Sequence, residues 1–244
     1  MELAPTIKIE PEIELTRPNE RDMKEHLKPG LHRVLDDAHE KPAYVFPSTV
    51  QVDLNSFSGV WFETHRSLIP SKTFEKDLQC VTVEYGIPEA SSFLGIFAEV
   101  PTMTVNQSGR KGGPTGPEKS GTATLWQFDA NNNSGKLVMT RPNKAIVGSY
   151  YVHSLGEKDE KHGLYSWAVI TNLLGNSVWI LARKPQKFYE HDMDIVLKML
   201  EEQGFNKDFN RPIATHQGAD CIYPSYVHHD GKTKPKHKPK PKHL

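Results

Sequence analysis

The sequence predicts an all-β protein: an eight-stranded antiparallel up-and-down β-barrel with one C-terminal α-helix packed on its wall. Between residues 59 and 182, short runs of alternating apolar and polar residues recur, each ended by turn residues, with no helix between them. A single segment with helical spacing of apolar residues follows. Because sequential antiparallel strands must hide their edges, closure into a barrel is the expected outcome.

The eight strands differ in how clearly the pattern marks them. Residues 78–85 alternate best, with Cys80 and Thr82 on one face and Val83 and Tyr85 on the other. The last two strands form a hairpin. The Gly- and Lys-rich segment 107–120 is predicted to be a loop without order of its own, either a mobile lid or an insertion of no consequence. The predicted strands are 59–67, 78–85, 102–106, 122–128, 136–140, 147–153, 165–171 and 177–182.

The helix is expected over residues 188–203, after Pro185 and before Gly204, within a barrel domain of residues 53–224. Residues 1–52 are predicted to be a mostly irregular extension, with one or two helical turns at 31–38 and a barrel contact through 44–46. Residues 225–244 alternate Lys with Pro and His, a composition typical of a disordered tail. We expect a solvated end there rather than an anionic-surface or metal site.

Composition limits the class of protein. The chain has 244 residues, enough for one large or two small domains. Lys plus Arg and Asp plus Glu are both 30, so the balanced charge argues against nucleic acid as the main partner. No run of apolar residues is long enough for a transmembrane helix. The N-terminus lacks the pattern of a signal peptide, so we expect either that a leader has already been removed or that the chain is not exported by the signal-peptide route.

The chain has two cysteines, Cys80 and Cys221. From their number alone, two buried thiols and a disulfide are both open. A disulfide would close a loop of about 140 residues and stabilise the fold by roughly 3–5 kcal/mol.

Two segments resemble the lipocalin family. Asn55-x-x-x-Gly59-x-Trp61-Phe62-Glu63 and Trp179-Ile180-Leu181-Ala182-Arg183 are similar to its first and third signatures, most closely in the apolipoprotein D and bacterial lipocalin branch. The resemblance implies that Gly59 and Trp61 lie at the closed end of the barrel, with Arg183 across the indole ring. It also implies a disulfide between Cys80 and Cys221. The turn at 155–163 departs from the family, because it is longer and lacks Thr-Asp-Tyr.

The resemblance implies binding and transport or sequestration of a small hydrophobic ligand, such as a lipid, steroid, retinoid or bilin-type pigment. No metal and no cofactor other than such a ligand is expected. The closed-end pair fixes the inward phase of the first and last strands. On the second strand, an outward Cys80 places Val83 and Tyr85 inside, and for strands four, six and seven the aromatic residues are expected to face inward. The predicted ligand-binding residues are Glu63, His65, Val83, Tyr85, Phe128, Tyr151, Trp167, Trp179 and Leu181.

For several of these residues a purely structural role is an alternative to ligand binding. Glu63 and His65 are more simply explained by an internal hydrogen bond than by contact with a ligand. Trp179 is expected in the core whether or not it touches a ligand. Two other classes stay open for the chain: a structural or interaction protein with a filled barrel, and, less favoured, an isomerase with a free thiol. No hydrolase, zinc-protease or phosphate-loop motif supports an enzyme, and the implied disulfide points to secretion or another oxidising compartment.

Overall fold

The computed structural model describes residues 47–225 except 96–97 and 143, and its side chains except those of 94 and 144–147. These residues lie in the compact unit Ala43–Leu244. The predictions for the extension up to residue 46 and for the Lys/Pro/His tail fall outside the described residues.

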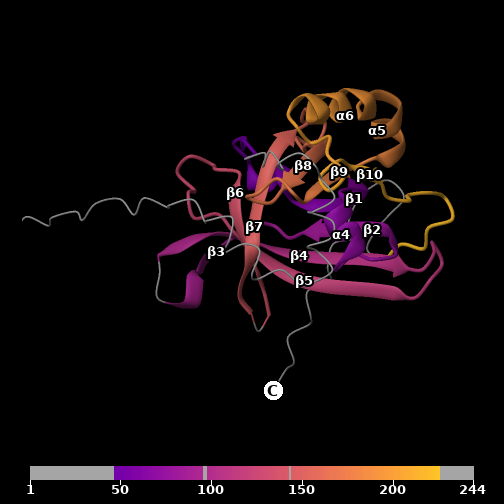
Figure 1. Cartoon of the computed structure of the whole chain (residues 1–244). Coiled ribbons are helices and arrows are strands. Elements are labelled where there is room, and N and C mark those ends of the chain that lie inside the picture. The colour runs from indigo at the N-terminus through magenta and orange to yellow at the C-terminus, as the bar shows by residue number, and fades with distance from the viewer. Residues whose placement is uncertain (1–46, 96–97, 143, 226–244) are drawn as a thin grey trace, which may run out of the picture. The chain divides into compact units, whose positions relative to one another are not determined.

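Eight antiparallel strands close into a barrel, as predicted from the sequence (Figure 1). Each strand pairs with the next, and the first also pairs with the last, so the sheet has no open edge along this path. Two short strands are added, β3 (Glu89–Ser92) beside β4 and β10 (Ile213–Ala214) beside β1. The barrel strands are β1 (Gly59–Arg66), β2 (Leu78–Tyr85), β4 (Glu99–Lys111), β5 (Glu118–Trp126), β6 (Lys136–Arg141), β7 (Lys144–Leu155), β8 (Trp167–Thr171) and β9 (Val178–Ala182).

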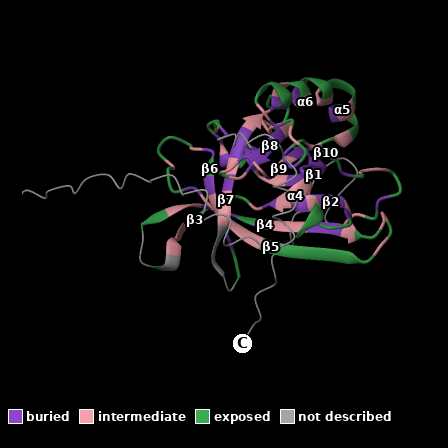
Figure 2. Cartoon of the chain, in the orientation of Figure 1, coloured by how far each residue is buried: buried purple, intermediate pink, exposed green. Residues whose placement is uncertain are grey.

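The predicted C-terminal helix is present as two helices, α5 (Pro185–His191) and α6 (Met193–Glu202), which meet at Asp192. The α6 side chains Val196 and Leu200 are buried against the outer face of β8 and β9. In Figure 2 the opposite face of these helices is exposed, as expected of an amphipathic helix on a barrel wall. Three short helical turns complete the described part: α3 (Leu54–Phe57), α4 (Leu68–Lys72) and η1 (Phe93–Gly95).

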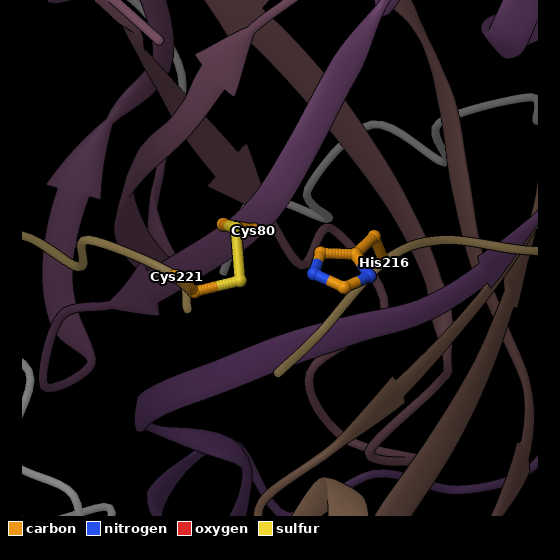
Figure 3. A group of neighbouring side chains, drawn as sticks. All are labelled: Cys80, His216 and Cys221. Carbon is orange, nitrogen blue, oxygen red and sulfur yellow. A yellow bond between two sulfur atoms is a disulfide. The ribbon is translucent and has the colours of Figure 1, made fainter. Parts of the chain in front are cut away.

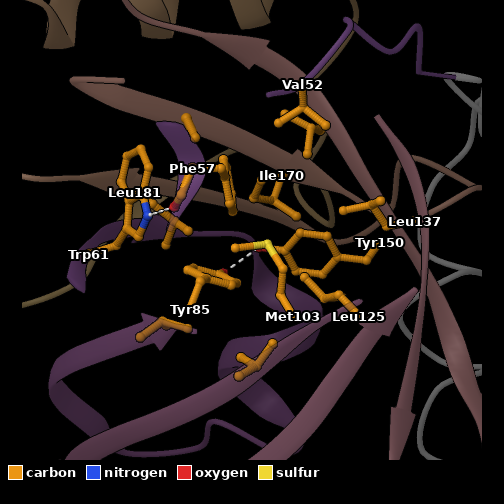
Figure 4. Packing of buried hydrophobic residues seen from close by; sticks show 14 of the residues in the cluster. Val52, Phe57, Trp61, Tyr85, Met103, Leu125, Leu137, Tyr150, Ile170 and Leu181 are labelled. Carbon is orange, nitrogen blue, oxygen red and sulfur yellow. Dashed lines mark hydrogen bonds between the residues drawn. The ribbon is translucent and has the colours of Figure 1, made fainter. Parts of the chain in front are cut away.

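The barrel interior holds the main apolar core (Figure 4). Phe57 and Trp61 pack with ring centroids 5.2 Å apart, and Phe57 also packs edge-on against Tyr85 at 4.9 Å. Burying a side chain of this size stabilises the fold by about 2–3 kcal/mol. The core therefore fills one end of the barrel up to the level of Tyr85.

The prediction of a structureless loop at 107–120 is wrong. β4 and β5 extend through most of it and pair without interruption from Thr102↔Trp126 to Arg110↔Glu118. The ladder satisfies the backbone groups that a loop would leave to water. Gly109 has a packing role, since a Cβ there would lie 3.0 Å from Cγ2 of Val81. Gly109 therefore allows a close approach between β4 and β2, and most of the segment is paired strand.

The C-terminal segment is tied to the barrel between β1 and β2. The Thr215 amide donates to the Thr64 carbonyl, and the Cys80 amide donates to the carbonyl of His216. Cys80 and Cys221 form a disulfide with Cα atoms 5.5 Å apart, the pairing that the resemblance implied (Figure 3). This segment fills the place where β2 bulges away from its neighbours.

Candidate ligand-binding site

The barrel encloses a cavity of about 430 Å³ to which all eight barrel strands contribute side chains. Its walls are mainly apolar. The Tyr85 and Tyr150 hydroxyl groups hydrogen-bond to each other at its boundary with the core. Burial raises the pKa of both tyrosines, so the phenols are neutral. The lining residues are Glu63, Phe74, Glu75, Val83, Tyr85, Val105, Gln107, Gly121, Thr122, Ala123, Met139, Arg141, Gly148, Ser149, Tyr150, Ile170, Asn172, Ser177, Trp179 and Leu181.

The end of the barrel beyond the core is sealed by Arg183 and Trp61. The guanidinium lies 3.9 Å from the ring centroid, and it donates hydrogen bonds to four backbone carbonyls, among them those of Val60 and Tyr165. Burial lowers the pKa of Arg183 to about 9, which still leaves it charged at neutral pH. Gly59 has φ +96°, and a Cβ on it would lie 2.9 Å from Nη1 of Arg183. The signature residues thus hold the closed end.

Three ionisable side chains form a buried cluster on the β1 side of the cavity. Arg66 Nη1 lies 3.0 Å from Glu63 Oε1 and 3.8 Å from Glu75 Oε2. Thr215 Oγ1 donates to the same Glu63 oxygen over 2.9 Å. Of the cluster, Glu63 is fully buried and Glu75 is 2% exposed.

The two acids of this cluster differ in how their oxygens are satisfied. Glu75 accepts from Gln107 at 2.6 Å through Oε1 and from the Trp179 indole at 3.0 Å through Oε2. Glu63 Oε2 has no hydrogen-bond partner among the residues that the structure describes. Burial, reinforced by the charge of Glu75, raises the pKa of Glu63 to about 8, although Arg66 and Thr215 act against the rise. Glu63 is therefore protonated at neutral pH.

Five of the predicted ligand-binding residues lie on this cavity: Glu63, Val83, Tyr85, Trp179 and Leu181. The period-2 alternation of β2 and β9 places them as expected. That they touch a ligand stays a prediction.

His65 does not line the cavity, so its predicted position is wrong. A β-bulge between Glu63 and His65 reverses the phase of β1, and the imidazole turns outward to Phe188 and Tyr189 of α5, with centroids 6.3 and 6.4 Å away. Burial lowers the pKa of His65 to about 4.

Phe128, Tyr151 and Trp167 also lie away from the cavity. On β7 the inward position belongs to Tyr150, so the alternation turns Tyr151 to the other face. Trp167 packs with the cluster under α5 and α6. Phe128 lies past the end of β5 and packs on Trp126, with 45% of its surface exposed. The choice of aromatic residues thus gave the wrong phase for these strands.

The sequence reasoning missed several residues of the site. Arg66 is not among the predicted residues, since on a regular strand it would lie on the opposite face from Glu63. Glu75 and Phe74 follow α4 in a segment for which no fold was predicted. The sequence prediction places Tyr151 inside the barrel, but the structure places Tyr150 there. Only the alternation of large apolar residues on β7 offered a signal for it.

Cys80, His216 and Cys221 bring potential metal-ligand atoms within 4.8 Å of one another (Figure 3). The two sulfurs are bonded to each other, so neither is a thiolate able to ligate a metal. His216 Nε2 lies 2.8 Å from a carboxylate oxygen of Asp220. The group is therefore a structural tether.

No protein-family model matches the chain, and no curated protein matches it. Its barrel is similar to insecticyanin from the tobacco hornworm Manduca sexta, at 20% identity over 73% of this chain and 88% of that one, with a TM-score of 0.48. It is also similar to lobster apocrustacyanin A1, at 16% identity over 75% and 96% of the two chains, with a TM-score of 0.43. A third similar structure is japanin from Rhipicephalus appendiculatus bound to cholesterol, at 12% identity over 72% and 100%, with a TM-score of 0.41.

The closed barrel, the C-terminal helices on its wall and Arg183 across Trp61 are features of this chain itself. The fold is lipocalin-like. Among the described residues, no helix is long and apolar enough to cross a membrane.

Proposed function

We propose that this lipocalin-like protein binds a small hydrophobic molecule in its barrel and transports or sequesters it, without catalysing a reaction on it. The observation that carries the proposal is the cavity of about 430 Å³, walled largely by apolar side chains. Its volume falls in the range of about 300–1,000 Å³ that is typical of small-molecule sites. A ligand that hides about 300 Å² of apolar surface gains roughly 7 kcal/mol before ordering costs.

The cavity also bears on the alternatives. A structural barrel filled by its own side chains would leave no such space. An isomerase of the thiol type would need a free cysteine near the cavity, and the two cysteines of the chain form the disulfide. The disulfide supports an oxidising compartment, and we propose that the protein is secreted. A place in the apolipoprotein D and bacterial lipocalin branch is part of the same proposal and rests on the two signature segments.

Binding is tested by titrating the protein with retinol, oleic acid, progesterone and biliverdin. Quenching of Trp fluorescence reports occupancy because Trp179 lines the cavity, and equilibrium dialysis gives an independent affinity. We expect at least one of these probes to bind with micromolar affinity or better. If the folded protein binds none of them, and native mass spectrometry of protein from its own source finds it empty, the proposal is overturned.

A matched pair of variants locates the binding. Ala123 lines the cavity, whereas Thr124 is the next residue on β5 and has the opposite phase. Ala123→Phe should fill the cavity and weaken binding about tenfold or more, since the added ring takes the space of the ligand. Thr124→Phe should leave affinity within about twofold, because its side chain lies outside the barrel. Equal effects of the two variants would place the binding elsewhere.

A further inference from the structure

We propose that the ligand of this cavity is an apolar molecule with a cationic amine, and that Glu63 is the counter-ion of the amine. The inference rests on the proposed function and names the chemical class of its ligand. It comes from the buried polar cluster on the β1 side of the cavity.

The first observation is an unused acceptor. Glu63 lines the cavity and has no exposure to solvent. Its Oε1 accepts hydrogen bonds from Arg66 Nη1 and Thr215 Oγ1, whereas Oε2 accepts none from the described residues. Buried side-chain oxygens are nearly always hydrogen-bonded, and an unsatisfied one destabilises the fold. An N–H group of a ligand would supply the missing donor.

The second observation is the charge of the cluster. Two carboxyl groups, Glu63 and Glu75, share one guanidinium, that of Arg66. With both acids ionised the cluster carries one uncompensated negative charge, and such a charge in a buried place requires a proton or a second cation. Glu75 already has hydrogen-bond donors on both oxygens, from Gln107 and Trp179. The place for a second cation is therefore at Glu63.

The rest of the cavity fits such a ligand. Among the described lining residues the one cation is Arg141, which is exposed on β6. A fatty-acid carboxylate placed beside this cluster would meet the negative charge of Glu75, and it could not supply the hydrogen-bond donor that Glu63 Oε2 lacks, so it is disfavoured. The apolar walls accommodate a hydrocarbon body, and the ring of Trp179, 6.2 Å from that of Phe74, offers an aromatic surface beside the cluster.

Binding of the amine is coupled to a proton. The titratable and charged groups that face Glu63 are Arg66 of β1, Glu75 after α4 and Tyr85 of β2. Burial raises the pKa of Glu63 to about 8, so at pH 7 its carboxyl holds a proton. An alkylamine enters as the ammonium ion, because its pKa is about 10. The ammonium replaces the carboxyl proton, which leaves to the buffer.

The test compares octylamine, octan-1-ol and octanoate, three probes with the same chain, by isothermal titration calorimetry at pH 7. Buffers of different ionisation enthalpy give the number of protons released. We expect octylamine to bind about tenfold or more tightly than octan-1-ol, with octanoate weakest. We also expect close to one proton released per octylamine and none for octan-1-ol.

Glu63→Gln should remove both the preference for octylamine and the proton release. Glu89→Gln, at an exposed acid on β3, is the matched control and should change neither. If Glu63→Gln does not fold, the probe comparison and the proton count on the unaltered protein decide the question. Equal affinity for octylamine and octan-1-ol without proton release overturns the inference but leaves the proposed function standing. Failure of all three probes and of the larger ligand panel overturns both.

Discussion

Arg66 and Glu63 are three residues apart on β1, and yet the Arg66 Nη1 atom lies 3.0 Å from Oε1 of Glu63 inside the barrel. On a regular strand, residues three apart point to opposite faces. The bulge after Glu63 adds one residue, so that Glu63 pairs with Leu181 and Arg66 pairs with Trp179, both of them inward residues of β9. The same irregularity that brings Arg66 into the cluster therefore turns His65 out of it.

Glu63 and His65, on either side of the bulge, make stability depend on pH in two opposite ways. Burial raises the pKa of Glu63 from an ordinary 4.5 to about 8, so its contribution is complete below pH 4.5 and is lost as pH rises through 8. Burial lowers the pKa of His65 from 6.5 to about 4, so its contribution is complete above pH 6.5 and is lost as pH falls through 4. Between pH 4.5 and 6.5 the two slopes oppose each other, and above pH 6.5 that of Glu63 remains.

We therefore expect the free energy of unfolding to fall as pH rises from 6.5 to 8. Urea denaturation at half-unit steps of pH measures it. Glu63→Gln should flatten this limb, because its amide does not titrate, and His65→Asn should flatten the acid limb alone. A variant at Glu63 that keeps the full slope of the unaltered protein would show that another group titrates there.

A second prediction concerns Arg183. Arg183→Ala removes the cation over Trp61 and the hydrogen bonds to four carbonyls, two of which belong to Ser56 and Phe57. We expect the free energy of unfolding to fall by about 2–4 kcal/mol. Arg183→Lys keeps the charge but lacks the planar fork, and it should recover less than half of the loss.

Lys187→Ala, at an exposed position of α5, is the control for Arg183 and should change stability by less than about 0.5 kcal/mol. Chemical denaturation followed by Trp fluorescence measures all three variants. An Arg183→Lys protein as stable as the unaltered one would mean that charge alone, without the hydrogen-bond geometry, holds the closed end.

The closed end was predictable from sequence because Gly59, Trp61 and Arg183 belong to the two segments that resemble lipocalin signatures. Trp61 lies near the start of β1 and Arg183 directly after the end of β9, and once the two are paired, period 2 assigns Trp179 and Leu181 to the interior. The pairing of Cys80 with Cys221 followed from the resemblance and not from the number of cysteines.

The polar cluster was not predictable in the same way. A bulge adds one residue without changing composition, so nothing local distinguishes Thr64 from a regular strand residue. Tyr150 and Tyr151 are chemically alike, and only the register of β7 against its neighbouring strands decides which of them faces inward. At Gly109 the local signal pointed the wrong way: glycine suggests a loop, but here it allows the close approach of Val81 from the neighbouring strand.

A third prediction separates two reasons why a position requires glycine: backbone strain at positive φ and steric contact of an added Cβ. Gly59→Ala places a Cβ 2.9 Å from Arg183 Nη1 at φ +96°, so strain and contact act together. We expect a loss of about 2–3 kcal/mol in the free energy of unfolding. Gly112→Ala has φ +79° with nothing within 4 Å of the added Cβ, so it should cost only about 1 kcal/mol. Equal losses in urea denaturation would mean that backbone strain alone matters at Gly59.

The last prediction concerns the tether between the C-terminal segment and β2. The Cys80→Ala/Cys221→Ala double variant opens a loop with a sequence separation of 141 residues, and we expect it to unfold with about 3–5 kcal/mol less free energy. The unaltered protein in reductant should match it. Asp220→Ala keeps the disulfide while removing the exposed contact with His216, and it should unfold at the same urea midpoint as the unaltered protein.

The tether should also act on the cavity. Thr215 donates to Glu63, and Gln217 Nε2 donates to the carbonyls of Glu63 and Val81, so the segment holds β1 and β2 together beside the cluster. The Thr215 amide donates a hydrogen bond to the Thr64 carbonyl. Loss of the disulfide should speed hydrogen exchange of this amide, so that it exchanges much faster than the amides of the barrel core. If that amide instead exchanges at the rate of the core in the double variant, the hydrogen bonds of the segment are sufficient to hold it, and the disulfide stabilises the protein solely through the unfolded state.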